Sequence, residues 1–440
     1  MTNADRFLEI KATIAAENGP DFEAKVTKAW SELLGELDGA TKAIAKEGPQ
    51  ARFLGRYSVA ASLSARSVSR ESPNIKRKGT VVIKDVVDDD VARGWKTALE
   101  DFIQKNPQVE GFPADDKQFF MLYWTKSQIE ARAHPNMLAA TTWLNNLYHT
   151  TGSSEETLEG VDLKTPLSYA DRFRIRHPGG HWGNHPPHVD GGTIERWEDT
   201  KLRACFADIL AGSWRQHDAY ALEPRLEART SLYKRPNQSS VFRTFQGWLA
   251  LSNTAPGQGT LRVFPDVLLS NAYIILRPFF RPLVDIDSAD IWDAKNWVFD
   301  LANPEIPGVF QHPNQKGFGL HPTHNLHPNL RLNETMTSVP AVSPGDTVFW
   351  HCDVVHSVET EHHGNEDSAV MYIPAVPLTP ANKAYIARQI DTFRAGIPPP
   401  DFPVAVTGKD FVGLATEEDF AEAVDAAKVA MGLAVVAASA

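Results

Sequence analysis

Two histidines and one aspartate have the types and the spacing of a metal site. His188 and Asp190 are separated by a single residue, and His356 follows much later in the chain. Because alternate residues of an extended segment point the same way, His188 and Asp190 can present an imidazole and a carboxylate to one ion. His356 begins a late apolar segment and can supply a third ligand from a facing wall. Two imidazoles and one carboxylate on one face of the ion form the ligand set of non-haem Fe(II) oxygenases.

The surroundings of these residues favour that interpretation. Pro186-Pro187 bends the chain before the pair, and Gly191-Gly192 lets the backbone turn sharply or approach a ligand closely. The segment 344–351 is typical of a turn and a buried strand, and a short turn separates it from His356. A rival pair, His351-Cys352-Asp353, has only His356 as a nearby third partner, which is too close in sequence to reach the far wall easily.

Further histidines allow a second interpretation. His321, His324 and His327 lie close together in sequence, which predicts either a separate zinc site or a polar loop over the active site. His181 and His185 precede the first ligand pair, and we interpret them as residues of a lid or as supports of the ligands.

The elements that must position these residues change character near Pro166. Before it, apolar residues from Phe22 to Leu37 recur at helical spacing, Gly48-Pro49 ends that helix, and 91–103 and 127–148 predict further helices. After it, short apolar or alternating segments separated by turn residues predict the strands 169–176, 241–252, 259–265, 336–342, 347–351, 356–359 and 368–374.

These patterns predict a mainly β chain with helical flanks, that is, an α+β protein with a double-stranded β-helix (jelly roll) core. Thr416 and Asp419 form a capping box that begins a C-terminal helix. We predict a helical N-terminal region (1–165), a jelly-roll catalytic domain (166–380) with insertions at about 195–240 and 281–335, and a C-terminal helical extension (381–440).

Composition excludes several classes of function. The 440 residues are 42% hydrophobic and 22% charged, as in ordinary globular proteins, and the net charge of −11 argues against a nucleic-acid partner. Cys205 and Cys352, the two cysteines, cannot build a disulfide framework. Without a long apolar stretch or an apolar start, we expect a cytoplasmic protein with no membrane partner. The oligomeric state stays open.

Four long segments carry a resemblance, namely Asp171–Arg176, His188–Asp199, Phe242–Ser252 and Pro344–Glu359, and Asp401-Phe402-Pro403 near the end also matches. They resemble one bacterial and fungal family, once described as a domain of unknown function. The chain is similar over nearly its whole length to this glucose-inducible-gene-like family, whose bacterial members are the YbiU-like proteins.

The family itself resembles the phytanoyl-CoA hydroxylase branch of the 2-oxoglutarate-dependent oxygenases, and Gly259–Pro265 is similar to a strand of that group. The resemblance implies a jelly roll, Fe(II) bound by His188, Asp190 and His356, 2-oxoglutarate as co-substrate and O2 as oxidant. The expected reaction oxidises a C–H bond of a small polar metabolite. Some fungal oxygenases that look related act on small amino acids and can close an aziridine ring, so hydroxylation, desaturation and ring closure are all open.

One position departs from the wider group, which places an arginine on its last strand to bind the distal carboxylate of 2-oxoglutarate. Ser368 stands about there, and a hydroxyl offers no charge-assisted fork. Another arginine must substitute, or the co-substrate differs. Arg262 and Arg176 are favoured because they lie on predicted strands near the metal; the other candidates are Arg174, Arg243 and Arg277.

Other residues can form the substrate pocket or belong to the core. Glu195 and Arg196 can hold a polar substrate or form plain ion pairs, and the aromatic walls are predicted to be Trp350, Trp197, Trp248 and Tyr372. Two readings compete with an oxygenase: a metal-dependent, cupin-like enzyme that is not an oxygenase, which could use the same ligands for zinc, and a degenerate binding protein.

Overall fold

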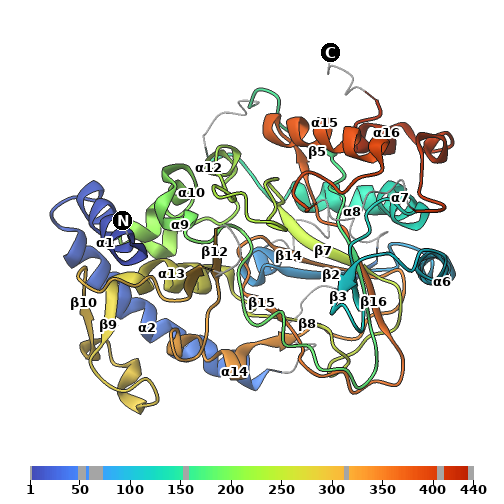
Figure 1. Cartoon of the computed structure of the whole chain (residues 1–440). Coiled ribbons are helices and arrows are strands. Elements are labelled where there is room, and N and C mark those ends of the chain that lie inside the picture. The colour runs from blue at the N-terminus through green and yellow to red at the C-terminus, as the bar shows by residue number, and fades with distance from the viewer. Residues whose placement is uncertain are drawn as a thin grey trace.

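The computed structural model describes residues 2–47, 56–58, 73–151, 158–311, 317–403 and 411–434. Helices and strands build one α+β fold, as predicted (Figure 1). Its centre is an eight-stranded sheet in which seven strands run antiparallel and the edge strand β1 is parallel to its neighbour. In sheet order the strands are β1 (Arg56–Ser58), β2 (Thr80–Lys84), β14 (Thr347–His351), β7 (Phe245–Ala250), β16 (Ser368–Tyr372), β6 (Phe173–Arg176), β4 (Phe119–Phe120) and β3 (Gly111–Phe112).

A smaller antiparallel sheet carries the later part of the candidate site. Its order is β13 (Thr337–Ser338), β8 (Leu261–Val263) and β15 (His356–Val358). Among the described residues no ladder joins the two sheets into a closed barrel. Three further pairs are β9 (Phe280–Pro282) with β10 (Trp297–Phe299), β11 (Val309–Gln311) with β12 (Phe318–Leu320), and β5 (Asp162–Pro166) with β17 (Pro377–Leu378).

The helices surround the sheets and also fill both long insertions. The α-helices are α1 (Asn3–Glu17), α2 (Phe22–Lys46), α6 (Asp89–Lys105), α7 (Lys126–Ala133), α8 (Pro135–Asn145), α9 (Glu195–Glu198), α10 (Thr200–Ala204), α11 (Ala207–Leu210), α12 (Glu223–Leu226), α13 (Val267–Leu276), α14 (Leu332–Thr335), α15 (Pro380–Ala395) and α16 (Asp425–Met431). The 3-10 helices are η1 (Trp214–Gln216), η2 (Arg277–Phe279), η3 (Ala289–Trp292), η4 (Ala294–Asn296), η5 (Pro328–Leu330) and η7 (Glu417–Phe420).

The helical periodicity of the N-terminal sequence is confirmed by α2. Its apolar stripe includes Val26, Trp30 and Leu37, all buried. The Trp30 ring stacks on Phe280 at 4.7 Å between ring centroids, which ties α2 to the insertion after residue 280. Gly48-Pro49, where we expected the helix to end, lies outside the described residues. The capping box of Thr416 and Asp419 is present and begins η7, with α16 following it.

Residues 1–165 contribute strands as well as helices. Val81, Val82 and Ile83 of β2 are buried, and β2 pairs with β14 inside the main sheet. The N-terminal region therefore builds part of the sheet that supports the candidate site, in addition to the helices that we predicted there.

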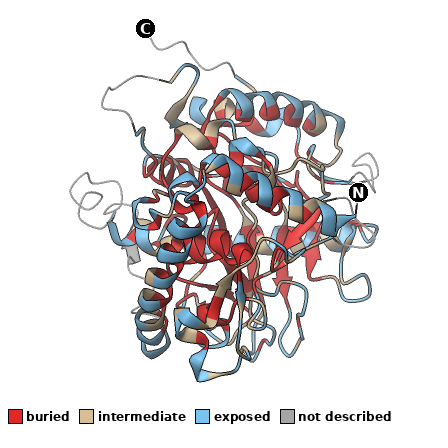
Figure 2. Cartoon of the chain, turned by 90° about the vertical axis from the view of Figure 1, so that its left-hand side faces the viewer, coloured by how far each residue is buried: buried red, intermediate tan, exposed pale blue. Residues whose placement is uncertain are grey.

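The core lies between the sheets and the helices. Figure 2 shows that the strands are buried and that the outer helices expose one face to solvent. One apolar cluster surrounds the main sheet, and a second lies under α1, α2 and α13. No helix in the described part of the chain is both long and apolar enough to cross a membrane.

Candidate metal centre

The two histidines of the predicted triad meet through their backbones. The N–H of His188 donates to the carbonyl of His356 at 2.9 Å, and the N–H of His356 donates to that of His188 at 3.0 Å. Residues opposite each other in an antiparallel bridge place their side chains on the same side. The two imidazole rings accordingly lie 4.1 Å apart between centroids.

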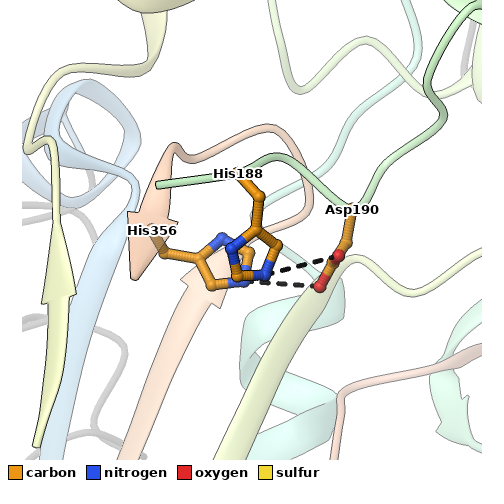
Figure 3. A group of neighbouring side chains, drawn as sticks. All are labelled: His188, Asp190 and His356. Carbon is orange, nitrogen blue, oxygen red and sulfur yellow. Dashed lines mark ion pairs between the residues drawn. The ribbon is translucent and has the colours of Figure 1, made fainter. Parts of the chain in front are cut away.

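Asp190, two residues after His188, faces both rings (Figure 3). One carboxylate oxygen lies 3.6 Å from Nε2 of His188, and the other lies 3.3 Å from Nε2 of His356. One potential ligand atom from each of the three residues lies within 4.8 Å of the others. The structure therefore brings together the triad that the sequence predicts, with the geometry of a site for one small cation.

Hydrogen bonds to the backbone orient both imidazoles. Nδ1 of His188 lies 2.6 Å from the carbonyl oxygen of Pro186, and Nδ1 of His356 lies 2.9 Å from that of Val354. Because a carbonyl oxygen only accepts, each Nδ1 carries its proton and donates it. Each Nε2 then faces Asp190, which is the arrangement of metal-binding histidines.

Electrostatics keeps His188 and Asp190 in their metal-binding forms. Burial, with the neighbouring His356, lowers the pKa of His188 to about 4, so its imidazole is neutral at pH 7. Burial opposes ionisation of Asp190, but His188 and His356 outweigh it and hold the pKa of that carboxyl well below its usual range. A cation among the three groups would balance the carboxylate charge and accept the lone pairs.

A polar cavity of about 280 Å³ opens beside the triad. His356, Val358 and Leu261 line it from the small sheet, so the two sheets face each other across it. The residues that line it from the main sheet are Phe119, Arg174, Gln246, Gly247, Trp248, Trp350 and Tyr372, and Arg172 lines it just before β6. Polar groups from both sheets and from loops thus surround a space large enough for a small metabolite.

Gly191 lets the chain pass close to the turn before β15. A Cβ at this position would lie 2.7 Å from the carbonyl oxygen of Cys352 and 3.1 Å from a carboxylate oxygen of Asp353. Gly192 has φ +86°, a conformation that side chains rarely adopt. Of the two functions expected for Gly191-Gly192, the sharp turn is found at Gly192, whereas the close approach of Gly191 is to the turn before β15 and not to a ligand.

The rival set His351-Cys352-Asp353 is held by other partners. Its potential ligand atoms also lie within 4.8 Å of one another. However, the Asp353 carboxylate forms buried ion pairs with Arg196, at 2.8 Å, and with Arg225. Nε2 of His351 lies 2.6 Å from the hydroxyl of Tyr148. Asp353 and His351 therefore already have strong partners, and we interpret this cluster as a structural ion-pair network.

Glu195 and Arg196, considered for substrate binding, lie under the site and do not line the cavity. Glu195 is fully buried and accepts from the backbone and hydroxyl of Thr193, at 2.9 and 2.7 Å. Arg196 binds Asp353. Among the predicted aromatic walls, Trp350, Trp248 and Tyr372 line the cavity, and Trp197 does not.

The residues favoured for binding the co-substrate lie outside the cavity lining. Arg262 alternates with the inward-facing Leu261, and its guanidinium donates to the carbonyl of Met336 at 2.8 Å. Arg176 donates to three backbone carbonyls, those of Glu359, Gly180 and Thr360. The hydroxyl of Ser368 receives a hydrogen bond from that of Thr254. Arg277, another candidate, also donates to backbone carbonyls.

The histidine cluster of residues 321–327 spreads apart. The ring of His321 lies 6.0 Å from that of His188, whereas His324 pairs with Asp287 and His327 is buried near Tyr273. The loop therefore approaches the site, as one of the two interpretations predicted, and does not gather the three imidazoles on one ion.

His181 and His185, which precede the triad, also lie in different surroundings. His185 lines the cavity and accepts a hydrogen bond from Trp182, whereas His181 is exposed and pairs with Glu361.

Gln246 was not among the predicted site residues, and Arg174 was a candidate ranked below Arg262 and Arg176. Both line the cavity, and both carry buried nitrogen atoms without a hydrogen-bond partner. The alternation of β7 places Gln246 and Trp248 on the same face, so a polar residue in phase with a predicted wall was a usable indication.

Comparisons with known proteins place the chain in a family. The Gig2-like family profile matches residues 2–433. YbiU of Escherichia coli K12 is 33% identical over 355 residues, which cover 78% of this chain and 77% of that protein. The crystal structure of GlcNAc Inducible Gene 2 from Candida albicans has a TM-score of 0.84 with 32% identity, covering 97% of this chain and 89% of the other.

A crystal structure from Salmonella typhimurium LT2, whose protein carries the provisional name of an oxidoreductase, has a TM-score of 0.77 with 28% identity. It covers 98% of this chain and 97% of that one. The expected family is thus confirmed, with the correction that its fungal member is named for induction by GlcNAc, where we had named glucose. Because the family profile spans residues 2–433 and YbiU is 33% identical over 78% of this chain, the chain belongs to the Gig2-like family.

Proposed function

We propose that this protein is an Fe(II)- and 2-oxoglutarate-dependent oxygenase. The observation that supports the proposal most is the convergence of His188, Asp190 and His356 beside a polar cavity. Two imidazoles and one carboxylate would leave room on an iron ion for other ligands. The provisional name of the Salmonella relative agrees with an oxidation reaction.

The arrangement of the two sheets suits this proposal. The triad spans the bridge between the segment before α9 and the first residue of β15, and the main sheet faces it across the cavity. We propose that the two sheets correspond to a double-stranded β-helix core, with the helical N-terminal region, the insertions and the C-terminal helices built around it.

In this proposal His188, Asp190 and His356 would hold the iron. When both are bound, iron and 2-oxoglutarate supply the oxidation: 2-oxoglutarate loses CO2 and becomes succinate, one atom of O2 enters succinate, and the other enters the substrate or leaves as water. The chain itself orients the reactants and excludes water. Trp248, Trp350 and Tyr372 provide the walls for this.

The cavity points to a small polar substrate. A space of about 280 Å³ lined by arginine, glutamine, asparagine and tyrosine suits a compact metabolite with hydrogen-bonding groups, such as an amino acid. Whether hydrogen abstraction from such a substrate ends in hydroxylation, desaturation or ring closure depends on how the cavity walls hold its carbon atoms.

An anaerobic titration tests the proposal. Purified protein receives Fe(II) and then 2-oxoglutarate while the visible spectrum is followed for the weak charge-transfer band of a keto acid chelating Fe(II). We expect a saturable band in the wild type and none in His188→Ala. Its absence from iron-loaded wild-type protein would contradict the oxygenase assignment and favour a cupin-like zinc enzyme or a binding protein.

A further inference from the structure

Arg174 is a buried cation without an anionic partner among the residues that the structure describes. It lies in β6, is 2% exposed and lines the cavity beside the triad. Its Nε and Nη1 atoms are buried without a hydrogen-bond partner, and Nη2 makes one long contact, 3.4 Å, to the carbonyl of Gly259. Burial of an unpaired charge is costly, so this guanidinium is arranged for an anion that enters the cavity.

Arg174 and Arg176 lie on the same face of β6 but differ in their hydrogen-bond partners. Arg174 lies opposite Val370 of β16 and Phe119 of β4, and Phe119 also lines the cavity. Arg176 is two residues further along the same face, opposite Ser368, and its Nη1 and Nη2 atoms donate to backbone carbonyls, so that of its donor atoms Nε alone lacks a partner. Arg174 thus lies two residues from the position opposite Ser368, on the strand next to β16, and it lines the cavity.

Two further donors of the cavity lack partners. Gln246 and Trp350 lie opposite each other on β7 and β14, and Nε2 of Gln246 and Nε1 of Trp350 are buried without a hydrogen bond. The Trp350 ring lies 5.3 Å from that of His356. Free donors therefore occur both beside the triad and on β6, which suits a ligand with acceptor groups at two ends.

We infer that Arg174 binds the distal carboxylate of 2-oxoglutarate, so that the anchoring arginine stands on β6 and not on β16. Nη1 and the remaining hydrogen of Nη2 can form a two-pronged contact with a carboxylate. Gln246 and Trp350 are placed to donate to the oxygen atoms at the chelating end. This inference rests on the proposed function, because it takes the keto acid to be chelated at the triad.

The test compares two keto acids in two proteins. Fe(II)-loaded wild type and Arg174→Gln are titrated without oxygen, following the charge-transfer band, with 2-oxoglutarate and with 2-oxopentanoate, in which a methyl group replaces the distal carboxylate. We expect the wild type to bind 2-oxoglutarate about 10- to 100-fold more tightly than 2-oxopentanoate. In Arg174→Gln the preference should vanish, while the affinity for 2-oxopentanoate changes less than about twofold.

Two controls separate anchoring from damage to the fold. Arg262→Gln removes an arginine from the outer face of β8 and should leave both affinities unchanged. Arg174→Lys keeps the charge without the fork and should bind 2-oxoglutarate with intermediate affinity. Fe(II) affinity and melting temperature, measured for each variant, show whether the centre is intact.

The outcomes distinguish the inference from the proposed function. A band in the wild type with an unchanged preference for 2-oxoglutarate in Arg174→Gln would overturn the assignment of Arg174 and leave the oxygenase proposal standing. Loss of the preference only in Arg174→Gln would support the assignment. The absence of a band in wild-type protein with both keto acids would overturn the two proposals together.

Discussion

At the scale of single residues, the candidate centre depends on close backbone approach as much as on its ligands. Asp190 can face His356 only because the chain after it passes against the carbonyl of Cys352 and the carboxylate of Asp353. Gly191 makes this passage possible, since any side chain would meet those atoms. A substitution of Gly191 would therefore displace the metal ligand Asp190 by moving the backbone next to it.

We therefore expect Gly191→Ala to weaken both metal binding and folding. A Cβ 2.7 Å from a backbone oxygen forces the two segments apart, which should lower the unfolding free energy by about 1–3 kcal/mol and the Fe(II) affinity at least several-fold. Urea unfolding and calorimetric Fe(II) titration measure the two effects. Gly183→Ala, where the nearest atom to the added Cβ is the end of an exposed side chain at 3.5 Å, is the control. Equal Fe(II) affinity in both variants would rule out this role of Gly191.

The ligand triad was predictable from local sequence, whereas the arginines were only partly so. His188, Asp190 and Gly191 lie in one short segment whose spacing carries the chemistry. Arg262 follows the inward-facing Leu261, so strict alternation already placed its side chain on the outer face. Nothing local separates Arg174 from Arg176, because the carbonyls that occupy Arg176 come from residues 359 and 360.

At the scale of elements, a buried ion-pair network joins the two segments that supply the ligands. Arg196 of α9 follows the first ligand pair, and Asp353 precedes β15, which begins with His356. Arg225 of α12 binds the same carboxylate. Asp353 and Arg196 are almost fully buried, so this pairing fixes the position of α9 relative to the turn before His356.

Removing the shared carboxylate should loosen this connection. In Asp353→Asn, two buried guanidinium groups lose their anion, and we expect the unfolding free energy to fall by about 3–5 kcal/mol. Fe(II) affinity should fall as well, because the two ligand segments are no longer tied. Chemical denaturation and metal titration measure both. Asp287→Asn, an exposed carboxylate that pairs with His324, should change neither. Unaltered stability of Asp353→Asn would mean that the network does not hold the elements together.

The type of an element could be predicted where its apolar pattern repeats over several turns, and could not be predicted where the element is only a few residues long. The stripe of α2 spans several turns, so tertiary context could not hide it. The strand β2 offers only Val81, Val82 and Ile83 between Gly79 and Asp85, a run that fits a strand or a buried helix equally. The two-residue strands β4 and β3 carry almost no local pattern and owe their conformation to pairing, β4 with β6 and β3 with β4.

At the scale of the whole molecule, the order of strands in the main sheet depends on pairings between distant parts of the chain. β2 lies beside β14, and β6 lies between β16 and β4. Such pairings depend on which apolar faces cover each other, which one sequence does not specify. They also bury groups that can titrate, among them His217, His327 and His351, none of which belongs to the proposed triad.

These three buried histidines should make the fold sensitive to mild acid. Burial, the main cause, lowers the pKa of His217 to about 4 and those of His327 and His351 to about 3. A pKa lowered on folding means that the unfolded chain binds the proton more readily, so stability is full above about pH 6.5 and falls below it. From pH 7.5 to 5.5 the three together should remove about 4 kcal/mol from the unfolding free energy.

Urea unfolding of the chelator-treated protein at the two pH values measures this loss. His327→Gln removes one titrating group that makes no contact with the triad. Its own stability can differ from that of the wild type, but the difference between pH 7.5 and 5.5 should shrink by about 1.4 kcal/mol, because each buried neutral imidazole contributes separately to the slope. An undiminished difference in His327→Gln would mean that the acid sensitivity comes from other groups, and that His327 finds a partner for its proton inside the folded protein.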